Sequence, residues 1–301
     1  MKVAFIGTGT MGQPMLANLV KKGFQVVAYD TAPMALDAAV RLGAARAGSA
    51  AQAATAGELV ITMLPSSANV EAAYLGAGGG IVEGVAPGRL CVDMSTIDPG
   101  TSRRVAAQLK ERGVRFLDAP VSGGVGGAVA GTLANMVGGE ANDLEEARPA
   151  LAAMGGNIIH VGAVGAGEVA KLCNNLISGT VAVAVSEAFR IGEAFGVDPQ
   201  ILTSVIAKSS GATWVMERMH PVPGIVDDAA SSRQYTPGFM TDLMAKDLGL
   251  AVAAAPEKRV PVVVAPAAQQ LYRMASSHGF GRKDFSAVYQ FLKPSSDDAP
   301  V

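Results

Sequence analysis

Residues 1–30 have the sequence MKVAFIGTGTMGQPMLANLVKKGFQVVAYD, and they give the clearest signal of the fold. A short apolar run, Val3–Ile6, leads directly into the glycine-rich segment Gly7–Gly12. A helical pattern follows, and a second apolar run ends at Asp30. A strand, a glycine loop, a helix, a strand and a terminal acid, in this order, predict a βαβ unit that binds a dinucleotide.

The glycine loop is expected to hold the phosphates of the dinucleotide. Gly7 allows a tight turn, Gly9 lets the backbone approach a pyrophosphate, and Gly12 lets the helix pack closely on the sheet. The helix N-terminus adds N–H groups and a partial positive charge. We therefore expect cofactor contacts along the whole loop, from Gly7, Thr8, Gly9, Thr10, Met11 and Gly12.

Asp30 narrows the expected cofactor to NAD. A carboxylate at the end of the second strand can accept hydrogen bonds from the adenosine ribose hydroxyls. It would repel the 2′-phosphate of NADP. The next residue, Thr31, is not basic, and no arginine follows closely to bind such a phosphate.

The first half of the chain continues this alternation of strands and helices. Runs rich in Val, Ile and Leu predict strands buried on both faces of a parallel sheet at Val3–Ile6, Gln25–Tyr29, Leu59–Met63, Leu90–Met94, Arg115–Leu117 and Ile158–Val161. Helical patterns lie between them at Gln13–Lys22, Met34–Leu42, Ser49–Ala54, Pro99–Arg112 and Asp143–Met154. The expected fold class is therefore α/β, with a doubly wound sheet of the Rossmann type.

The pattern changes after Val161, where helices replace the strand series. A long helix without proline is expected at Glu168–Phe195, and further helices at Val197–Ser209, Thr241–Ala255 and Val263–Ser277. The prolines and glycines of His220–Gly238 predict an ordered loop, and the polar residues 294–301 a frayed end. We expect a dinucleotide-binding domain at 1–163 and an all-α domain at 164–301, of which 164–195 is a linking helix.

Composition limits the functions that the chain can serve. Half of the residues are hydrophobic, 17% are charged and the formal net charge is −2, which indicates a large core and neither a nucleic acid nor a membrane as partner. No apolar stretch is expected to span a bilayer, because the run after Leu172 is interrupted by Asn, Ser and Glu. Cys91 and Cys173 predict buried, reduced thiols in a cytoplasmic protein. The three histidines lack metal-ligand spacing, so no metal is expected.

A glycine pair after a strand is a candidate substrate site. Ser122, Gly123 and Gly124 can offer a hydroxyl and successive N–H groups to a substrate carboxylate. A flexible connection in a glycine-rich stretch explains the same residues equally well.

Two lysines are candidates for chemistry. Lys171 lies one helical turn before Asn175, and burial lowers the pKa of a lysine so that it can exchange a proton near neutrality. The alternative is a lysine that extends from a helix end to solvent. The pair Lys246-Asp247 lies in a helical pattern and fits an ordinary charged face.

Taken in order along nearly the whole chain, these motifs resemble the β-hydroxyacid dehydrogenase family. The matching segments are Phe5–Gly12, Met63–Pro65, Asp93–Thr96, Asp118–Gly124, Gly162–Asn175 and Met244–Ala251. The resemblance implies an N-terminal Rossmann domain, a long linking helix and an all-helical C-terminal domain. It also implies a homodimer or homotetramer that forms through those helices.

The resemblance also implies residue roles that the patterns leave open. Lys171 is expected to be the catalytic acid and base. The substrate is expected to contact Ser122, Gly123, Gly124, Asn175, Trp214, Phe239 and Asp247. NAD is expected to contact, beyond the glycine loop and Asp30, residues Leu64, Pro65, Asn69, Thr96 and Lys246.

The segment from Trp214 to Phe239 bears on the substrate. It resembles the specificity loop of the branch that oxidises (S)-3-hydroxyisobutyrate, with both aromatic residues as an apolar wall, although Arg218–His220 is less polar than that loop. We therefore expect NAD-dependent formation of methylmalonate semialdehyde, a step of valine breakdown. The alternatives are a sibling activity on serine, tartronate, glyoxylate or succinate semialdehyde, and, from another class, a non-catalytic NAD-binding scaffold.

Overall fold

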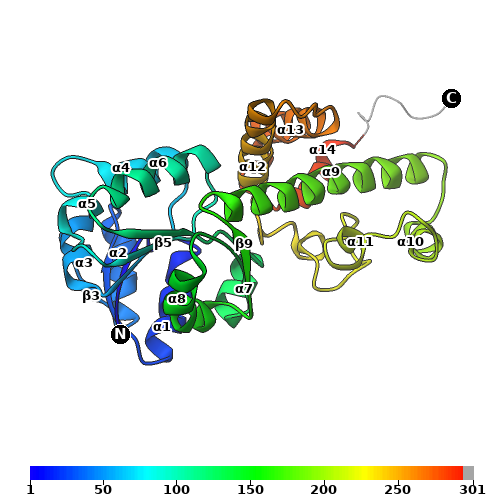
Figure 1. Ribbon diagram of the computed structural model, residues 1–301. Helices are drawn as coiled ribbons and strands as arrows, with labels where there is room; N and C mark the ends of the chain where they lie inside the picture. Colours follow the sequence, from blue (N-terminus) through cyan, green and yellow to red (C-terminus); the bar gives the residue numbers. More distant parts are fainter. Residues whose placement is uncertain (294–301) are drawn as a thin grey trace. The chain divides into compact units, whose positions relative to one another are not determined.

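The computed structural model describes residues 1–293 and forms two compact units, Met1–Lys171 and Leu172–Val301. The stretch 294–301, for which a frayed end is predicted, lies outside the described residues. Figure 1 follows the chain from the first unit, which contains the sheet, to the helical second unit.

The first unit is built on a nine-stranded sheet with the order β3-β2-β1-β4-β5-β6-β8-β7, in which β9 pairs with β8. All six predicted strands are present, as β1 (Lys2–Ile6), β2 (Gln25–Tyr29), β4 (Leu59–Thr62), β5 (Leu90–Asp93), β6 (Arg115–Asp118) and β9 (Asn157–Gly162). The strands from β3 to β6 pair in parallel. This order of parallel strands is the Rossmann arrangement, so the predicted fold class is confirmed.

Three strands are not predicted from the sequence: β3 (Ala45–Arg46), β7 (Val121–Ser122) and β8 (Ala134–Gly138). The first two are only two residues long, and β8 contains a central asparagine and methionine in place of a Val/Ile/Leu run. β8 pairs antiparallel with β6 and β7 and parallel with β9. The expectation of a wholly parallel sheet is therefore wrong at this edge, where the short helix α7 (Gly124–Ala130) returns the chain beside β7.

The strands alternate their side chains between two hydrophobic cores. Val3 and Phe5 of β1 belong to the first core and Ala4 and Ile6 to the second. The first core also holds residues of α1 (Gly12–Lys21), α2 (Pro33–Arg41) and α8 (Ala141–Met154). The second holds residues of α3 (Ala50–Ala56), α4 (Ser67–Leu75), α5 (Ile81–Gly84) and α6 (Pro99–Lys110). Figure 1 shows these helices on the two sides of the sheet, which explains why its central strands are apolar on both faces. The prediction of burial is wrong for β9, at the edge of the sheet, where Ile159 and Val161 are exposed.

The five predicted helices of the first unit are confirmed as α1, α2, α3, α6 and α8. α4, α5 and α7 are not predicted from the sequence. Ser66 caps α4 by accepting a hydrogen bond from the Asn69 N–H at 3.3 Å, a local signal that could have identified this helix. α5 and α7 are short and flanked or filled by glycine, so they lack a helical pattern.

The second unit is helical. The predicted helices are confirmed as α9 (Ala166–Ala194), which begins in the first unit, α10 (Pro199–Ala207), α12 (Thr241–Ala254) and α13 (Val264–Ala275). α11 (Trp214–Arg218), α14 (Val288–Phe291) and several one-turn helices were not predicted. Within residues 172–293 the one β-type pairing is an isolated bridge between Met240 and Asp284.

His220 explains why Arg218–His220 is less polar than expected. Its ring is fully buried and lies edge-on to Phe189 with 4.6 Å between centroids. Nδ1 accepts a hydrogen bond from the Val222 N–H at 3.2 Å, so in the neutral ring Nε2 carries the proton and donates it to the Thr203 hydroxyl at 3.1 Å. Burial lowers the pKa of His220 to about 4. His220 is therefore part of the core, whereas Arg218 is exposed.

Two expectations are corrected on α9. By length and composition α9 could cross a membrane, with a mean hydropathy of 1.3 over its most apolar window, whereas the sequence analysis expected no such stretch. Of that window 44% is buried inside the protein, and a long core helix has the same composition. Cys173 is exposed, not buried, because it lies on the solvent side of this helix; Cys91 is buried as predicted.

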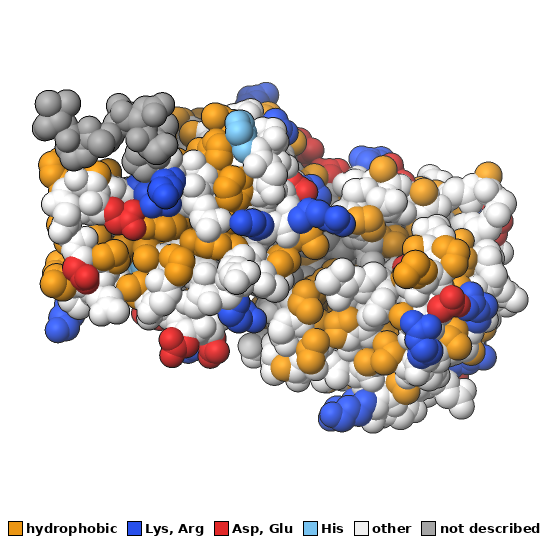
Figure 2. Space-filling model, turned by 180° about the vertical axis from the view of Figure 1, so that it is seen from behind, with side chains coloured by type: hydrophobic (Ala, Val, Ile, Leu, Met, Phe, Trp, Pro, Cys, Tyr) orange, Lys and Arg blue, Asp and Glu red, His pale blue; other side chains and the backbone are white. Residues whose placement is uncertain are grey.

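The surface carries mixed charge. Figure 2 shows Lys, Arg, Asp and Glu side chains on one face, with hydrophobic and other side chains between them. This distribution agrees with the small net charge of −2.

Candidate functional site

The glycine loop has the shape of a phosphate cradle. Gly7 has φ +93°, and a Cβ there would overlap the Met63 carbonyl, while a Cβ at Gly12 would overlap the carbonyl of Gly7. These two glycines are therefore required by the fold. Gly9 is exposed, and a Cβ on it would meet no protein atom within 4 Å. The open space at Gly9, in front of the N-terminus of α1, fits the pyrophosphate of NAD.

Asp30 has a second task besides the one predicted. Its Oδ2 accepts a hydrogen bond from the Thr8 N–H at 2.6 Å, and its Oδ1 accepts one from the Ala32 N–H at 2.8 Å. The acid thus fixes the glycine loop to the end of β2. Its side chain is half-buried, so lone pairs remain for ribose hydroxyls.

The predicted cofactor residues of the first unit lie at one edge of the sheet. β2, β1, β4 and β5 are neighbours, and their carboxyl ends lead into the glycine loop, Asp30, Leu64-Pro65 and Thr96. Asn69 lies in the first turn of α4, close behind Pro65 in the chain, and is exposed. The carboxyl edge of parallel strands is where this fold binds its ligand.

A buried polar network lies beneath this edge, and the sequence analysis missed it. Asp93 Oδ1 accepts hydrogen bonds from the hydroxyls of Thr62 at 2.7 Å and Ser95 at 2.5 Å. The Ser95 hydroxyl in turn accepts one from the Leu64 N–H at 2.8 Å. Burial raises the pKa of Asp93, and the hydrogen bonds from Ser95 and Thr62 lower it in part. The net result is a pKa of about 6. Polar residues at the ends of two apolar strands were the available signal.

The candidate carboxylate site lies after β6. Ser122 ends β7 and is half-buried, while Gly123 and Gly124 have φ +136° and +61°, a region that L side chains rarely adopt. Gly123 is exposed, which leaves its backbone open to a ligand. Both glycines thus adopt a turn conformation that favours glycine.

Lys171 lies in the second turn of α9 and is buried, with 5% of its surface exposed. Asp118, at the end of β6, caps this helix: its two carboxylate oxygens accept hydrogen bonds from the N–H groups of Gly165 at 2.7 Å and Glu168 at 2.9 Å. Burial raises the pKa of Asp118, and these backbone bonds lower it. A Cβ at Gly167 would overlap the carbonyl of Met136, so the helix start is pressed against the sheet. The position of Lys171 is therefore fixed.

In the second unit, three predicted residues come together. The Asn175 amide, one turn after Lys171, donates a hydrogen bond to Asp247 Oδ2 at 2.5 Å. Lys246 Nζ lies 3.1 Å from Asp247 Oδ1, an ion-pair contact without hydrogen-bond alignment. Asp247 and Asn175 are both buried, with 1% and 5% exposure, so the charged-surface alternative for Asp247 is excluded.

Trp214 and Phe239, the two predicted apolar contacts, take no part in these polar bonds. Trp214 begins α11 and is 59% exposed, and Phe239 lies edge-on to Phe285 with 6.3 Å between centroids. Within residues 1–293 neither has a hydrogen bond or ring contact to Asn175 or Asp247. The backbone around Phe239 is held by the buried Asp284, whose Oδ2 accepts from its N–H at 3.1 Å.

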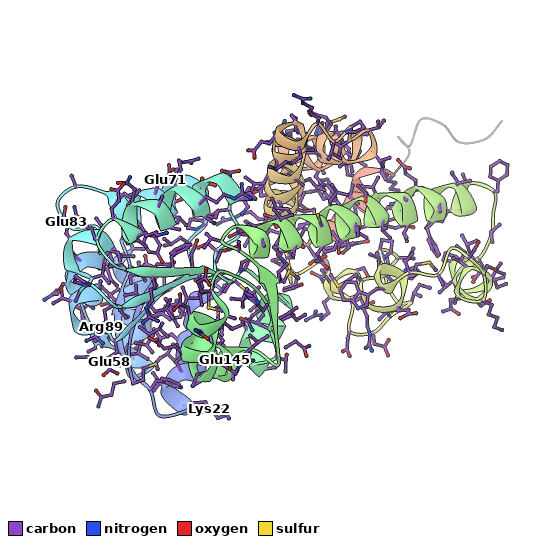
Figure 3. The ribbon with its side chains drawn as sticks, in the orientation of Figure 1. Lys22, Glu58, Glu71, Glu83, Arg89 and Glu145 are labelled. Atoms are coloured by element: carbon purple, nitrogen blue, oxygen red, sulfur yellow. The ribbon has the colours of Figure 1, made fainter. Side chains whose placement is uncertain are left out.

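Two acids of the first unit, Asp93 and Asp118, are buried beneath the candidate site, whereas many other charged side chains of this unit lie at the surface. Figure 3 labels charged side chains at its surface, among them Glu58, Glu83 and Glu145, which point outward. Asp93 and Asp118, in contrast, are fully buried beneath the carboxyl edge.

Comparisons with known proteins show which family the chain is similar to. Residues 2–162 match the family described as the NAD binding domain of 6-phosphogluconate dehydrogenase, and residues 165–292 the family described as NAD-binding of NADP-dependent 3-hydroxyisobutyrate dehydrogenase. An NAD-dependent L-serine dehydrogenase of Pseudomonas aeruginosa is 44% identical and covers 98% of both chains. Mitochondrial 3-hydroxyisobutyrate dehydrogenase of Rattus norvegicus is 43% identical over 97% of this chain and 87% of its own.

A solved structure extends the likeness to three dimensions. The 3-hydroxyisobutyrate dehydrogenase of Mycobacterium tuberculosis, described with L-serine, has a TM-score of 0.92 and 41% identity, and the match covers 97% of this chain and 99% of the other.

Proposed function

The chain belongs to the β-hydroxyacid dehydrogenases, the family of 3-hydroxyisobutyrate dehydrogenase, and from this premise we propose that it oxidises (S)-3-hydroxyisobutyrate to methylmalonate semialdehyde. It is an NAD-dependent oxidoreductase of that family. The observation that carries the proposal is Lys171, a buried lysine on a capped helix start in the same unit as the NAD cradle. We place this reaction in valine breakdown.

Lys171 is the proposed acid and base. In the oxidation its neutral amine takes the proton of the substrate hydroxyl, and as an ammonium it returns that proton in the reverse direction. The same charge stabilises the developing alkoxide. Bound NAD supplies the acceptor for the hydride that leaves C3.

The substrate carboxylate is assigned to the turn after β7. The Ser122 hydroxyl and the N–H groups of Gly123 and Gly124 can donate hydrogen bonds to the substrate carboxylate. No Asp or Glu stands next to them in the sequence. Holding the carboxylate there fixes C3 relative to the nicotinamide. Asn175 and Asp247 are assigned to the substrate as a preformed pair, with Trp214 and Phe239 as apolar contacts.

L-serine is the second candidate substrate. It also carries a carboxylate and a primary alcohol, and its ammonium group suits a buried carboxylate such as Asp247. The P. aeruginosa relative is an L-serine dehydrogenase, and the M. tuberculosis structure is described with L-serine. Tartronate, glyoxylate and succinate semialdehyde remain sibling candidates.

A substrate panel tests the proposal. We expect kcat/KM with NAD to be highest for (S)-3-hydroxyisobutyrate among β-hydroxy acids, and lower with NADP. A higher value for L-serine would replace 3-hydroxyisobutyrate with serine as the substrate. Tight NAD binding without turnover of any hydroxy acid would favour a non-catalytic scaffold.

We also propose a homodimer or homotetramer in the cytoplasm. α10 has no buried residue, and its Ile201 and Val205 are 61% and 55% exposed, as are Ile177 and Ile191 of α9 at 62% and 61%. Exposed apolar side chains of this size on two helices are typical of a surface that associates. Light scattering coupled to size exclusion measures the mass, and a monomer at micromolar concentration would contradict the proposal.

A further inference from the structure

The loop that carries Thr96 is pinned on both sides of that residue. On one side, the Ser95 hydroxyl accepts a hydrogen bond from the Leu64 N–H at 2.8 Å and donates one to Asp93 at 2.5 Å. On the other side, the Ile97 N–H donates a hydrogen bond to Glu168 Oε2 at 3.1 Å. Two residues that flank a predicted cofactor contact are thus tied to other elements.

Glu168 connects this loop to the helix of the proposed acid and base. It is the third residue of α9, it is fully buried, and Lys171 follows it three residues later, on the same helix face. An acid at this position often caps its own helix. Here Asp118 already does so, since it accepts from the Glu168 N–H at 2.9 Å, and the Glu168 side chain reaches the Ile97 loop instead.

From this geometry we propose that Glu168 is a positioning residue, which sets the distance between Lys171 and the Thr96 loop through its hydrogen bond to the Ile97 N–H. The inference rests on the proposed function of Lys171. A carboxylate of this length on a helix start packed against the sheet leaves little freedom to either element. Glu168 itself touches no reacting atom in this scheme; it acts through the backbone that carries Lys171 and Thr96.

Two substitutions separate reach from charge. Glu168→Gln keeps the length and a carbonyl oxygen that can accept from Ile97, and removes the charge. Glu168→Asp keeps the charge and shortens the side chain by one methylene. If position matters, the Gln variant retains kcat within about threefold, and the Asp variant loses about 10- to 100-fold, the scale of a misplacement near 1 Å.

Two further readouts accompany kcat, and the first of them, hydrogen exchange, does not depend on turnover. In the full-length protein with NADH bound, hydrogen exchange of the peptide that contains the Ile97 amide is expected to accelerate in Glu168→Asp and to stay near wild type in Glu168→Gln. The primary isotope effect with 4-deuterated NADH in the reverse reaction is expected to rise in the Asp variant only, because hydride transfer becomes rate-limiting. Val105→Ala, a buried change elsewhere in the same unit, controls for general destabilisation.

The outcomes are distinguishable. Wild-type exchange and kcat in Glu168→Asp would overturn the proposal, as would a loss in Glu168→Gln as large as in Glu168→Asp, since charge would then be the cause. A kcat loss in Val105→Ala equal to that of the Asp variant would also overturn it. If the wild-type protein oxidises no hydroxy acid, the proposed function fails, and the exchange rates still test the tie between Glu168 and Ile97.

Discussion

At the scale of single residues, burial separates the acids and bases that act on ligands from those that hold the fold. Asp30 is half-buried at the sheet edge and serves both tasks, since it accepts hydrogen bonds from Thr8 and Ala32. Asp118 is fully buried and serves only the helix start. Lys171 is also buried, although the usual place of a lysine is the surface.

Replacing Lys171 tests its proposed role directly. Lys171→Ala is expected to reduce kcat by about two to four orders of magnitude, because general acid–base catalysis is lost. NADH affinity, measured by fluorescence titration, is expected to stay unchanged. Turnover near wild type with intact NADH binding would show that another group moves the proton.

Asp30 is expected to set the cofactor preference. Asp30→Asn keeps an acceptor for the Thr8 N–H and removes the charge that repels a 2′-phosphate. The ratio of kcat/KM for NAD over NADP is expected to fall about fivefold, which corresponds to ~1 kcal/mol for a half-exposed charge interaction. An unchanged ratio would mean that the discrimination lies elsewhere.

At the scale of elements, two helix starts use glycine for different reasons. At α1 the open side of Gly9 faces no protein atom within 4 Å, whereas at α9 a Cβ on Gly167 would overlap the backbone of Met136. The space at Gly9 is available to a ligand, whereas the absence of a side chain at Gly167 lets the helix pack closely on the sheet. The two glycines therefore form a matched pair for experiment.

Alanine substitutions at these two glycines are expected to affect different properties, NAD binding at Gly9 and stability at Gly167. Gly9→Ala leaves the unfolding midpoint in place and weakens NAD binding, because the methyl group fills the cradle. Gly167→Ala destabilises the protein by about 1–3 kcal/mol, the usual range for overpacking. Thermal melts and NAD titrations of both variants measure these effects, and equal melting temperatures would contradict the packing argument.

At the scale of the whole molecule, two buried groups give opposite pH dependences of stability. His220 has a folded pKa of about 4, below its ordinary 6.5, so the unfolded chain binds more protons between these values and its contribution to stability rises with pH. Asp93 has a folded pKa of about 6, above its ordinary 3.8, so the folded chain binds more protons there and its contribution falls as pH rises.

Variants separate the two contributions. Between pH 4 and 6, Asp93→Asn is expected to make the slope of unfolding free energy against pH more positive than in the wild type. His220→Gln is expected to make it more negative. Urea titrations at several pH values measure the slopes, and a shift of the opposite sign in either variant would contradict the assigned burial effect.

Elements whose signals are local could be predicted from the sequence. The strand, glycine loop, helix and acid of residues 1–30, the long helix α9 and the helices after it follow from apolar spacing, turn residues and the absence of proline, all within short windows. The order of motifs also determined the family, because each motif has its own spacing. Strands of two residues and the reversed β8 gave no such signal.

The contacts that hold the site together depend on the tertiary fold and could not be predicted. The bonds from Ile97 to Glu168, from Glu168 to Asp118 and from Asn175 to Asp247 join residues 71, 50 and 72 positions apart. No pattern in the sequence relates such distant partners, because their meeting depends on how sheet and helices pack. The glycine loop identified the ligand, and long-range contacts between buried polar groups fixed the position of the lysine proposed to act on it.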